Sequence, residues 1–246
     1  MRITFISDTH TKHNMITGDL PGGDLLIHAG DMSSMGRAYE INDFCKWFDS
    51  IDSYDHKVFI AGNHDWGFID HIRFATTNEA AIPEHTQQTL NSYKTFDYLF
   101  DEWIVVGDGD PHDANTKTAK IYGSPWQPEF YDWAFNLPRR GDALRAAWEK
   151  IPEGTDILIT HGPAYGFVDT VYNRPASHLG CELLTERISI IKPKIHVCGH
   201  IHTGYGHFFD GTTHFINASV LDERYEYTQE PLTADWNPET NELKFL

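Results

Sequence analysis

The stretch "KIHVCGHIH", residues 194–202, ends a short apolar run with two histidines, His200 and His202, separated by a single residue. Apolar, β-branched runs of this length predict a buried strand. Four other runs share the pattern, because each is followed by polar side chains that can bind a metal ion. They are RITFIS before Asp8 and His10, DLLIHAG before Asp31, KVFIAG before Asn63 and His64, and DILIT before His161. In open α/β sheets ligands bind beyond the carboxyl ends of the strands, so the pattern predicts one cleft.

Helical periodicity fills the segments between these runs. Apolar residues recur at intervals of three and four over 34–51, with Ser34 as the N-cap, over 144–151 and over 179–191. The strand, helix, strand order of the first sixty residues predicts parallel pairing. The C-terminal runs are joined by turns instead, which indicates a second antiparallel or mixed sheet. They are THFINASV (213–220), ERYEYT (223–228) and ELKFL (242–246).

The composition narrows the class of partner and the compartment. The chain of 246 residues has a formal charge of −17, which disfavours a nucleic-acid polymer and leaves a small-molecule substrate. Three cysteines without CxxC spacing argue against a disulfide framework. The apolar run before Asp8 is too short for a signal peptide or a membrane span. We therefore expect a cytoplasmic protein without membrane contact, folded as one domain over residues 1–246, and its oligomeric state is left open.

The residues that follow the strands form a mixed oxygen and nitrogen donor set without thiolate. Two carboxylates, one carboxamide and four imidazoles suit Mn²⁺, Fe or Zn²⁺ better than Ca²⁺ or a cysteine-bound structural zinc. Seven side chains exceed what one ion takes while leaving room for a substrate, so a pair of ions is the economical interpretation. Each piece alone has a plainer interpretation as a turn or a helix cap. It is their conjunction after apolar runs that favours a metal site.

The order D-x-H, GD, GNHD, H and GHxH, spread from Asp8 to His202, resembles the calcineurin-like metallophosphoesterase superfamily. The resemblance implies an α/β fold, a four-layer αββα sandwich of two mixed β-sheets flanked by helices. It also implies two divalent metal ions, for which we expect Mn²⁺ first and Fe²⁺, Zn²⁺ or Mg²⁺ as alternatives. One ion would be held by Asp8, His10, Asp31 and His202. The other would be held by Asp31, Asn63, His161 and His200, with Asp31 bridging.

Three further segments, residues 122–141, 151–167 and 193–219, resemble one branch of this superfamily, the metallophosphoesterase-domain proteins. Members of that branch are class III cyclic nucleotide phosphodiesterases or close relatives. The vertebrate members of that branch have the sequence GGIH where this chain has GHIH, so a glycine takes the place of His200. The complete ligand set therefore implies an enzyme that binds both metal ions. It is expected to be more active than the glycine-bearing members and to retain its product less.

The expected function is a metal-dependent phosphodiesterase acting on small phosphodiesters, with cyclic nucleotides as the leading candidates. Two divalent ions roughly 3.5 to 4 Å apart can bind phosphoryl oxygens and hold a water or hydroxide in line with the leaving oxygen. Asp31 is then catalytic as the bridging ligand. His64, next to Asn63, is placed to protonate the leaving alkoxide as general acid, with Asp65 or another carboxylate as its partner. The alternative is that His64 only supports the metal ligands from outside and takes no part in the reaction.

The expected substrate-binding residues are Asn63, His64 and Tyr205, the last by stacking against a nucleobase. No arginine follows Asp31, in contrast to superfamily members that act on dianionic monoesters, and this favours a monoanionic diester. Arg139 and its neighbour in LPRRG can reach a phosphate, although a structural turn is the plainer interpretation.

The aromatic segment over residues 126–135 offers further rings, which can equally pack as a lid. Two other functions stay open. One is a nucleotide-binding regulatory protein with vestigial hydrolysis. The other is a broad-specificity phosphatase or a nuclease, and the acidic charge opposes a nuclease.

Overall fold

The computed structural model describes residues 1–71, 74, 80–108, 117–171 and 174–246. Its first sheet contains six strands: β1 (Arg2–Ile6), β2 (Gly23–His28), β3 (Tyr54–Phe59), β4 (Asp97–Tyr98), β15 (Leu232–Asn237) and β16 (Glu242–Phe245). They lie in the order β16-β15-β1-β2-β3-β4. β1, β2 and β3 pair in parallel, as the strand, helix, strand order predicts. β15 runs antiparallel to β1, so the sheet is mixed.

The second sheet also has six strands and is also mixed. They are β5 (Glu102–Asp108), β6 (Lys117–Ser124), β9 (Ile157–Thr160), β12 (Ile195–Cys198), β13 (Gly206–Phe209) and β14 (His214–Asn217). Their order is β13-β14-β12-β9-β6-β5. Two short pairs lie outside the main sheets: β7 (Gln127–Pro128) with β8 (Asn136–Leu137), and β10 (Thr170–Val171) with β11 (Arg174–His178).

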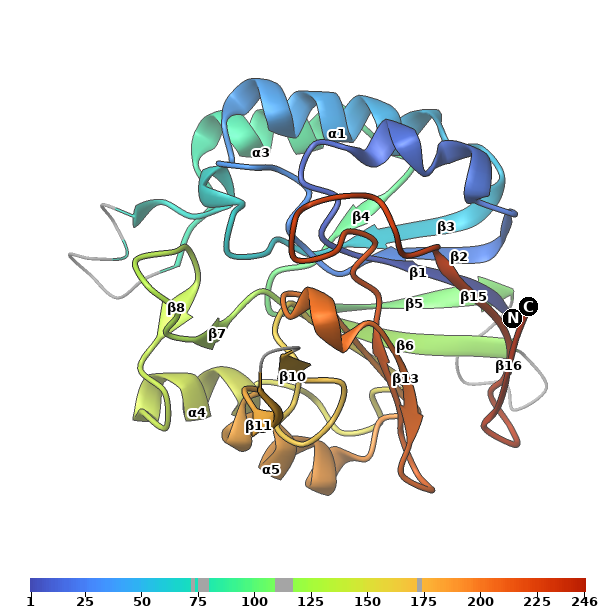
Figure 1. Cartoon of the computed structure of the whole chain (residues 1–246). Coiled ribbons are helices and arrows are strands. Elements are labelled where there is room, and N and C mark those ends of the chain that lie inside the picture. The colour runs from blue at the N-terminus through green and yellow to red at the C-terminus, as the bar shows by residue number, and fades with distance from the viewer. Residues whose placement is uncertain (72–73, 75–79, 109–116, 172–173) are drawn as a thin grey trace.

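Helices cover the outer faces of both sheets. Those described are α1 (Ala38–Ser50), α3 (Glu84–Asn91), α4 (Asp142–Glu149) and α5 (Glu182–Ile191). Figure 1 shows α1 and α3 over the first sheet, α4 and α5 over the second, and the two sheets face to face between them. The four-layer αββα sandwich is therefore confirmed. No helix in the described part of the chain is long and apolar enough to cross a membrane.

The core between the sheets comes from alternate residues of the central strands. In β2, Leu25 and Ile27 belong to the cluster shared by the two sheets, whereas Leu26 packs in the cluster that includes the helices. All three are fully buried. Because successive side chains of a strand point to opposite faces, such a strand is apolar on both sides. The polar side chains that can bind a ligand therefore follow the strand, at the point where the chain leaves the sheet.

Two helices begin later than the sequence predicts. The first begins at Ala38 and not near Ser34, because the Ser34 carbonyl oxygen accepts a hydrogen bond from Nδ1 of His64. The residues before the helix therefore belong to the loop that carries the site. The last begins at Glu182 and not at Leu179, whose side chain is 46% exposed.

A second mixed sheet exists, as the sequence predicts, but the C-terminal runs do not form it together. β14, from the run at 213–220, joins the second sheet beside β12, while β15 and β16 extend the first sheet beyond β1. ERYEYT (223–228) is a turn and not a strand. The carboxylate of Asp222 accepts the backbone N–H groups of Arg224 and Glu226 there. Such local bonds compete with strand pairing, so the alternating pattern does not form a ladder.

Candidate metal centre

The polar residues that follow the parallel strands are brought together at one end of the two sheets. They are Asp8 and His10 after β1, Asp31 after β2, Asn63 and His64 after β3, His161 after β9, and His200 and His202 after β12. Two groups of three side chains stand out, because within each group the ligand atoms all lie within 4.8 Å of one another. The first contains Asp8, His10 and His202, and the second contains Asp31, His161 and His200. A third group of the same compactness contains His10, Asp31 and His64. Each of the two main groups contains three of the four residues that the sequence resemblance implies for one ion.

The first group surrounds the buried carboxylate of Asp8. Its Oδ1 lies 3.3 Å from Nε2 of His202. Nε2 of His10 is buried and has no hydrogen-bond partner, and the nearest oxygen of Asp31 is 3.8 Å away. A buried polar atom without a partner costs about 1–3 kcal/mol. A cation bound at this position removes that cost, because the imidazole lone pair then has a partner.

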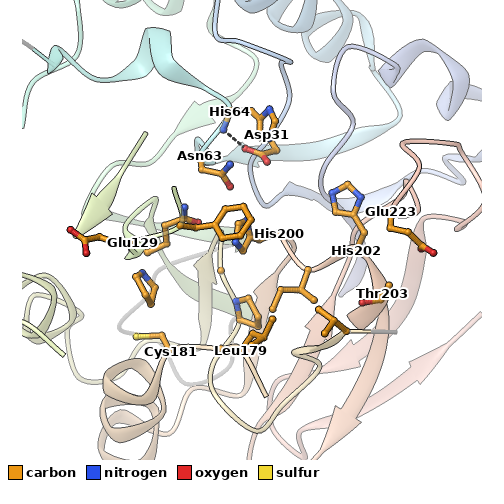
Figure 2. Close-up of a pocket in the computed structure, with 18 of the residues that line it drawn as sticks. Asp31, Asn63, His64, Glu129, Leu179, Cys181, His200, His202, Thr203 and Glu223 are labelled. Atoms are coloured by element: carbon orange, nitrogen blue, oxygen red, sulfur yellow. Dashed lines mark hydrogen bonds between the residues drawn. The ribbon is translucent and has the colours of Figure 1, made fainter. Parts of the chain in front are cut away.

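Asp31 connects the two groups. Its Oδ1 accepts the backbone N–H of His64 at 2.8 Å, the bond drawn in Figure 2. Its Oδ2 lies 3.2 Å from Nε2 of His161 and 3.8 Å from Nε2 of His10. The side-chain oxygen of Asn63 lies 3.0 Å from the same nitrogen of His161. One carboxylate oxygen thus faces imidazoles of both groups, which is the arrangement that a bridging ligand needs.

Backbone carbonyl groups orient three of the imidazoles in the same way. A carbonyl oxygen only accepts, so the ring nitrogen that contacts it carries the proton and the other nitrogen is left for the site. The Nδ1 atoms concerned are those of His10, His161 and His202, which bond to the carbonyl oxygens of Ser33, Ala29 and Asp222 at 3.1, 2.9 and 2.8 Å. Histidines that bind metals are oriented by such outer contacts.

The backbone is strained at four of the seven candidate ligands. Their φ angles are positive: 55° at Asp8, 39° at His10, 56° at Asp31 and 66° at His200. Residues other than glycine rarely adopt this region, and strained backbone of this kind costs of order 1–3 kcal/mol at each position. These conformations turn side chains that leave separate strands toward a common point, so the strain is concentrated where the ligands converge.

Two imidazoles are charged at neutral pH in the metal-free protein. Burial disfavours the imidazolium of His161, but the Asp31 carboxylate outweighs burial and raises the pKa of His161 to about 9. Burial is likewise outweighed at His202, where the Asp8 carboxylate raises the pKa to about 9. These two imidazolium groups lie beside the buried carboxylates of Asp31 and Asp8, which require positive charge next to them.

Two other imidazoles are neutral in the same conditions. Burial dominates at His10 and lowers its pKa to about 4, although the nearby carboxylates oppose the shift. Burial also lowers the pKa of His200 to about 3. Neutral imidazole is the form that binds a metal ion, so these two ligands need lose no proton.

The donor set fits two divalent cations. Asp8 and Asp31 are buried, and among the described residues no Lys or Arg forms an ion pair with either carboxylate. Two buried negative charges require positive charge beside them. Carboxylate, carboxamide and imidazole ligands suit Mn²⁺, Fe and Zn²⁺.

Comparison with known proteins agrees with this geometry. The family model of calcineurin-like phosphoesterases matches residues 1–204, a range that contains all seven candidate ligands. The chain belongs to the calcineurin-like phosphoesterase family. The resemblance found in the sequence is therefore confirmed.

Individual relatives of this calcineurin-like phosphoesterase support the same assignment. Human metallophosphoesterase domain-containing protein 1 is 40% identical over 237 residues, which span 95% of this chain and 70% of that protein. One solved structure, 14% identical, aligns over 100% of this chain and 98% of its own with a TM-score of 0.68. TT1561 of Thermus thermophilus, 11% identical, aligns over 100% and 97% with a TM-score of 0.59. These two distant structures show the fold alone.

The candidate metal centre of the phosphoesterase opens into a cavity of about 600 Å³. Figure 2 shows Asp31, Asn63 and His64 along one side of it, with Leu179 and Cys181 at the opposite side. Pockets of several hundred Å³ accommodate small-molecule ligands. The cavity is thus polar at the metal centre and has room for a group that extends away from it.

The partner of the His64 ring is a carbonyl group and not a carboxylate. Its Nδ1 bonds to the Ser34 carbonyl oxygen at 2.9 Å. The carboxylate of Asp65 is directed elsewhere, and accepts the N–H of Gly62 at 2.8 Å and the hydroxyl of Ser33 at 2.6 Å. Burial and then the charge of Asp31 raise the pKa of Asp65 to about 6. Asp65 therefore connects the loop after β2 with the loop after β3, and the His64 ring is held by a backbone carbonyl group instead.

A loop between β7 and β8 completes the wall of the cavity. We call residues 127–137 the aromatic loop. Trp133 stacks on His64, with ring centroids 4.0 Å apart and planes 24° apart. Phe130 lines the cavity and stands edge to face with His200, its ring centroid 5.2 Å away at 88°. The density of aromatic residues was the signal in the sequence, but it did not indicate which rings contact the site.

Two tyrosines differ from their expected places. The hydroxyl of Tyr205 donates to the Glu230 carbonyl oxygen at 2.7 Å, and Tyr205 is not among the residues that line the cavity. Tyr225, in the turn after β14, does line it. Its ring centroid lies 4.8 Å from that of His10 and 5.4 Å from that of His202. Sequence reasoning missed Tyr225 because its segment resembles a strand.

Proposed function

We propose that the protein is a metal-dependent phosphodiesterase that hydrolyses small, monoanionic phosphodiesters, with cyclic nucleotides as the leading substrates. The observation that carries the proposal is the shared Oδ2 of Asp31, which faces imidazoles of both ligand groups. Two divalent cations bound there, Mn²⁺ being the first choice, supply Lewis-acid stabilisation of the phosphoryl group and an activated water nucleophile. The protein's own residues then have to orient the ester and protonate the leaving group.

His64 is the proposed general acid, and its surroundings support that role. Nδ1–H donates to the Ser34 carbonyl oxygen, so Nε2 is the atom that can hold a proton for the leaving oxygen. The backbone N–H of His64 donates to Asp31, which fixes the residue relative to the proposed bridging ligand. Both His64 and Asn63 line the cavity, in keeping with their proposed contact with the substrate.

The charges around the cavity support a diester over a monoester. The carboxylates of Glu129 and Glu223 lie at its two edges in Figure 2. Among the described residues that line the cavity, Arg139 is the one Lys or Arg, and its guanidinium lies 3.0 Å from the Glu182 carboxylate. A second negative charge on the substrate therefore meets carboxylates and an already paired cation. This also disfavours a nucleic-acid polymer, whose neighbouring phosphates would be repelled.

A cytoplasmic location is part of the proposal. Cys45, Cys181 and Cys198 are buried and unpaired. Unpaired cysteines are typical of a reducing compartment. The formal charge of −17 supports a freely diffusing small-molecule substrate as the partner.

Turnover by reconstituted protein tests the proposal. Metal-free protein is loaded in turn with Mn²⁺, Mg²⁺, Fe²⁺ or Zn²⁺ and assayed with 2′,3′- and 3′,5′-cyclic nucleotides, linear dinucleotides, bis(p-nitrophenyl) phosphate and monoesters. We expect kcat/KM for diesters to exceed that for monoesters by at least about tenfold, the equivalent of 1.4 kcal/mol of transition-state stabilisation. A preference for monoesters contradicts the proposal. Nucleotide binding without turnover under every metal favours the regulatory alternative.

A further inference from the structure

Two large apolar side chains face the cavity from separate elements. Phe130, in the aromatic loop, is 46% exposed, and Leu179, between β11 and α5, is also 46% exposed. Both line the cavity beyond the candidate metal ligands. Single exposed apolar residues are ordinary, but their convergence on one cavity indicates a surface that a ligand covers.

Phe130 is held in place by a side chain from the other end of its loop. Oδ1 of Asn136 accepts the N–H of Phe130 at 3.3 Å, and Nδ2 of Asn136 donates to the carbonyl oxygens of Phe130 and Tyr131 at 3.3 and 2.7 Å. The Phe130 ring meets Tyr131 and His200 in edge-to-face contacts, at 4.8 and 5.2 Å between centroids. The ring is therefore fixed before a ligand arrives, and nearly half of the surface of the residue stays exposed.

Leu179 is tied to the same loop. Its N–H donates to the Asp169 carbonyl oxygen at 3.2 Å, and its own carbonyl oxygen accepts Nη1 and Nη2 of Arg139, each at 3.3 Å. Arg139 follows the end of the aromatic loop and is held by Glu182. The guanidinium thus holds the backbone of Leu179 against the segment that follows the aromatic loop. The guanidinium is therefore already paired within the protein, as the structural interpretation of Arg139 predicts, and is not a free phosphate-binding group.

We propose that Phe130 and Leu179 form a slot that binds the planar, uncharged substituent of the diester, a nucleobase, while the ester lies at the metal centre. This inference rests on the proposed phosphodiesterase function and names what selects its substrate. Stacking on an aromatic ring recognises the presence of a base more than its identity, so purines and pyrimidines are both accepted.

Among the described residues that line the cavity, Tyr225 is the other exposed aromatic residue, and its contacts give it a different place. Its ring centroid lies 4.8, 6.4 and 5.4 Å from those of His10, His64 and His202. It therefore forms the wall of the metal centre. Phe130 contacts the ring of one candidate ligand, His200, and the rest of its exposed face is open to a base attached to the ester.

The test compares substrates with and without a base on the same reacting ester. Adenosine 2′,3′-cyclic phosphate and adenosine 3′,5′-cyclic phosphate are each paired with the methyl ribofuranoside that carries the same cyclic phosphate and a methoxy group in place of adenine. For the Mn²⁺-loaded protein, we expect kcat/KM to be about tenfold higher for the nucleotide, as one stacked base allows. Phe130→Ala is expected to bring this ratio close to one, mainly through KM, and Phe130→Trp to preserve it.

A matched variant separates the slot from a general loss of apolar surface. Phe209 lies on β13, is 44% exposed and does not line the cavity. Phe209→Ala is expected to keep the wild-type ratio. An unchanged ratio in Phe130→Ala overturns the slot, and so does a ratio that collapses in Tyr225→Ala instead.

Binding measurements distinguish failure of the slot from failure of the proposed function. Calorimetric titration of the Mn²⁺-loaded protein with AMP and with ribose 5-phosphate requires no hydrolysis. We expect about tenfold tighter binding of AMP, lost in Phe130→Ala. If no diester is hydrolysed while this preference holds, the phosphodiesterase proposal fails and the slot stands. Equal affinities for the two ligands in the wild-type protein overturn the slot.

Discussion

The indole of Trp133 stacks on the imidazole of His64, with ring centroids 4.0 Å apart and planes inclined by 24°, while the Ser34 carbonyl oxygen accepts a hydrogen bond from Nδ1 of the same imidazole. The stack fixes the plane of the ring and the carbonyl fixes its rotation within that plane. His10 adds an edge-to-face contact at 4.6 Å. The ring is thus positioned by three neighbours, and its Nε2 is the atom left for chemistry.

Replacing His64 by alanine is expected to slow substrates with poor leaving groups far more than substrates with good ones. General acids typically contribute 10²- to 10⁴-fold, and an alkoxide needs the proton whereas a nitrophenolate does not. The measurement is kcat for methyl phosphodiesters whose leaving groups range from p-nitrophenol to simple alcohols, with metal content determined in parallel. Equal losses across the series argue against a general acid.

Trp133 variants show whether the stack matters to this role. Trp133→Phe retains an aromatic face and is expected to keep most of the rate with alkyl leaving groups, whereas Trp133→Ala loses about tenfold with them, as small misplacements of a catalytic group do. Loss that is the same for every leaving group would indicate a general structural defect.

Asp31→Asn is expected to remove both metal ions and abolish diester hydrolysis. Oδ2 of Asp31 faces His10 in one group and His161 in the other, so both sites lose a charged ligand at once. Metal analysis of the purified variant is the measurement. Asp55→Asn, at an exposed position on β3, serves as the matched control and keeps its metal. Full occupancy in Asp31→Asn contradicts the bridging assignment.

His200→Gly separates the two sites. His200 belongs to the group of Asp31 and His161 and not to that of Asp8, so the variant is expected to hold about one ion per chain and to lose most of its turnover. The space left by the imidazole favours tighter binding of a nucleotide monophosphate, measured by titration with AMP. His207→Gly, outside the cavity, is the control. Unchanged turnover in His200→Gly shows that the imidazole holds no metal needed for catalysis.

The candidate ligands were predictable because each follows an apolar run, and parallel strands bring their carboxyl ends to the same edge. Asp31 after β2 and His161 after β9 come from different sheets, and the packing of the two sheets brings their side chains within 3.2 Å. The contacts that orient the ligands were not predictable. The tautomer of His202 depends on the Asp222 carbonyl oxygen, which the sequence offers no way to place.

The errors have local and long-range causes. ERYEYT alternates like a strand, but the Asp222 carboxylate captures two backbone N–H groups and turns the chain, which carries Tyr225 to the site. The helix near Ser34 starts late because His64, 30 residues away, takes the Ser34 carbonyl. The places of β15 and β16 follow from packing beside β1, a choice of partner that no local pattern specifies.

Lys57→Met is expected to destabilise the fold although Lys57 lies outside the site. Its buried ammonium donates to three carbonyl oxygens at the end of α1, those of Phe48, Asp49 and Ile51, at 2.6, 3.0 and 2.6 Å. Removing the donor leaves buried carbonyl groups without partners, at a cost of roughly 2–4 kcal/mol. Urea unfolding of the metal-free protein measures the loss. Lys46→Met, exposed on α1, should change stability by less than about 0.5 kcal/mol.

Metal binding is expected to release protons from two of the four imidazole ligands. In the metal-free protein the carboxylates outweigh burial and raise the pKa of His161 and His202 to about 9, so both are protonated at pH 7.5. Burial lowers the pKa of His10 to about 4 and of His200 to about 3, so both are already neutral. Since a metal ion binds the neutral ring, loading both sites at pH 7.5 releases about two protons per chain.

The sign of the pH dependence follows. Protons compete with the metal below the raised pKa, so apparent affinity for Mn²⁺ rises with pH up to about 9 and levels off above it. Calorimetric titration in two buffers of different ionisation enthalpy counts the protons released. His202→Ala is expected to release about one proton, whereas in His10→Ala the site that remains intact still releases the proton of His161 on loading. Proton release near zero at pH 7.5 would show that neither carboxylate holds an imidazolium in the metal-free centre.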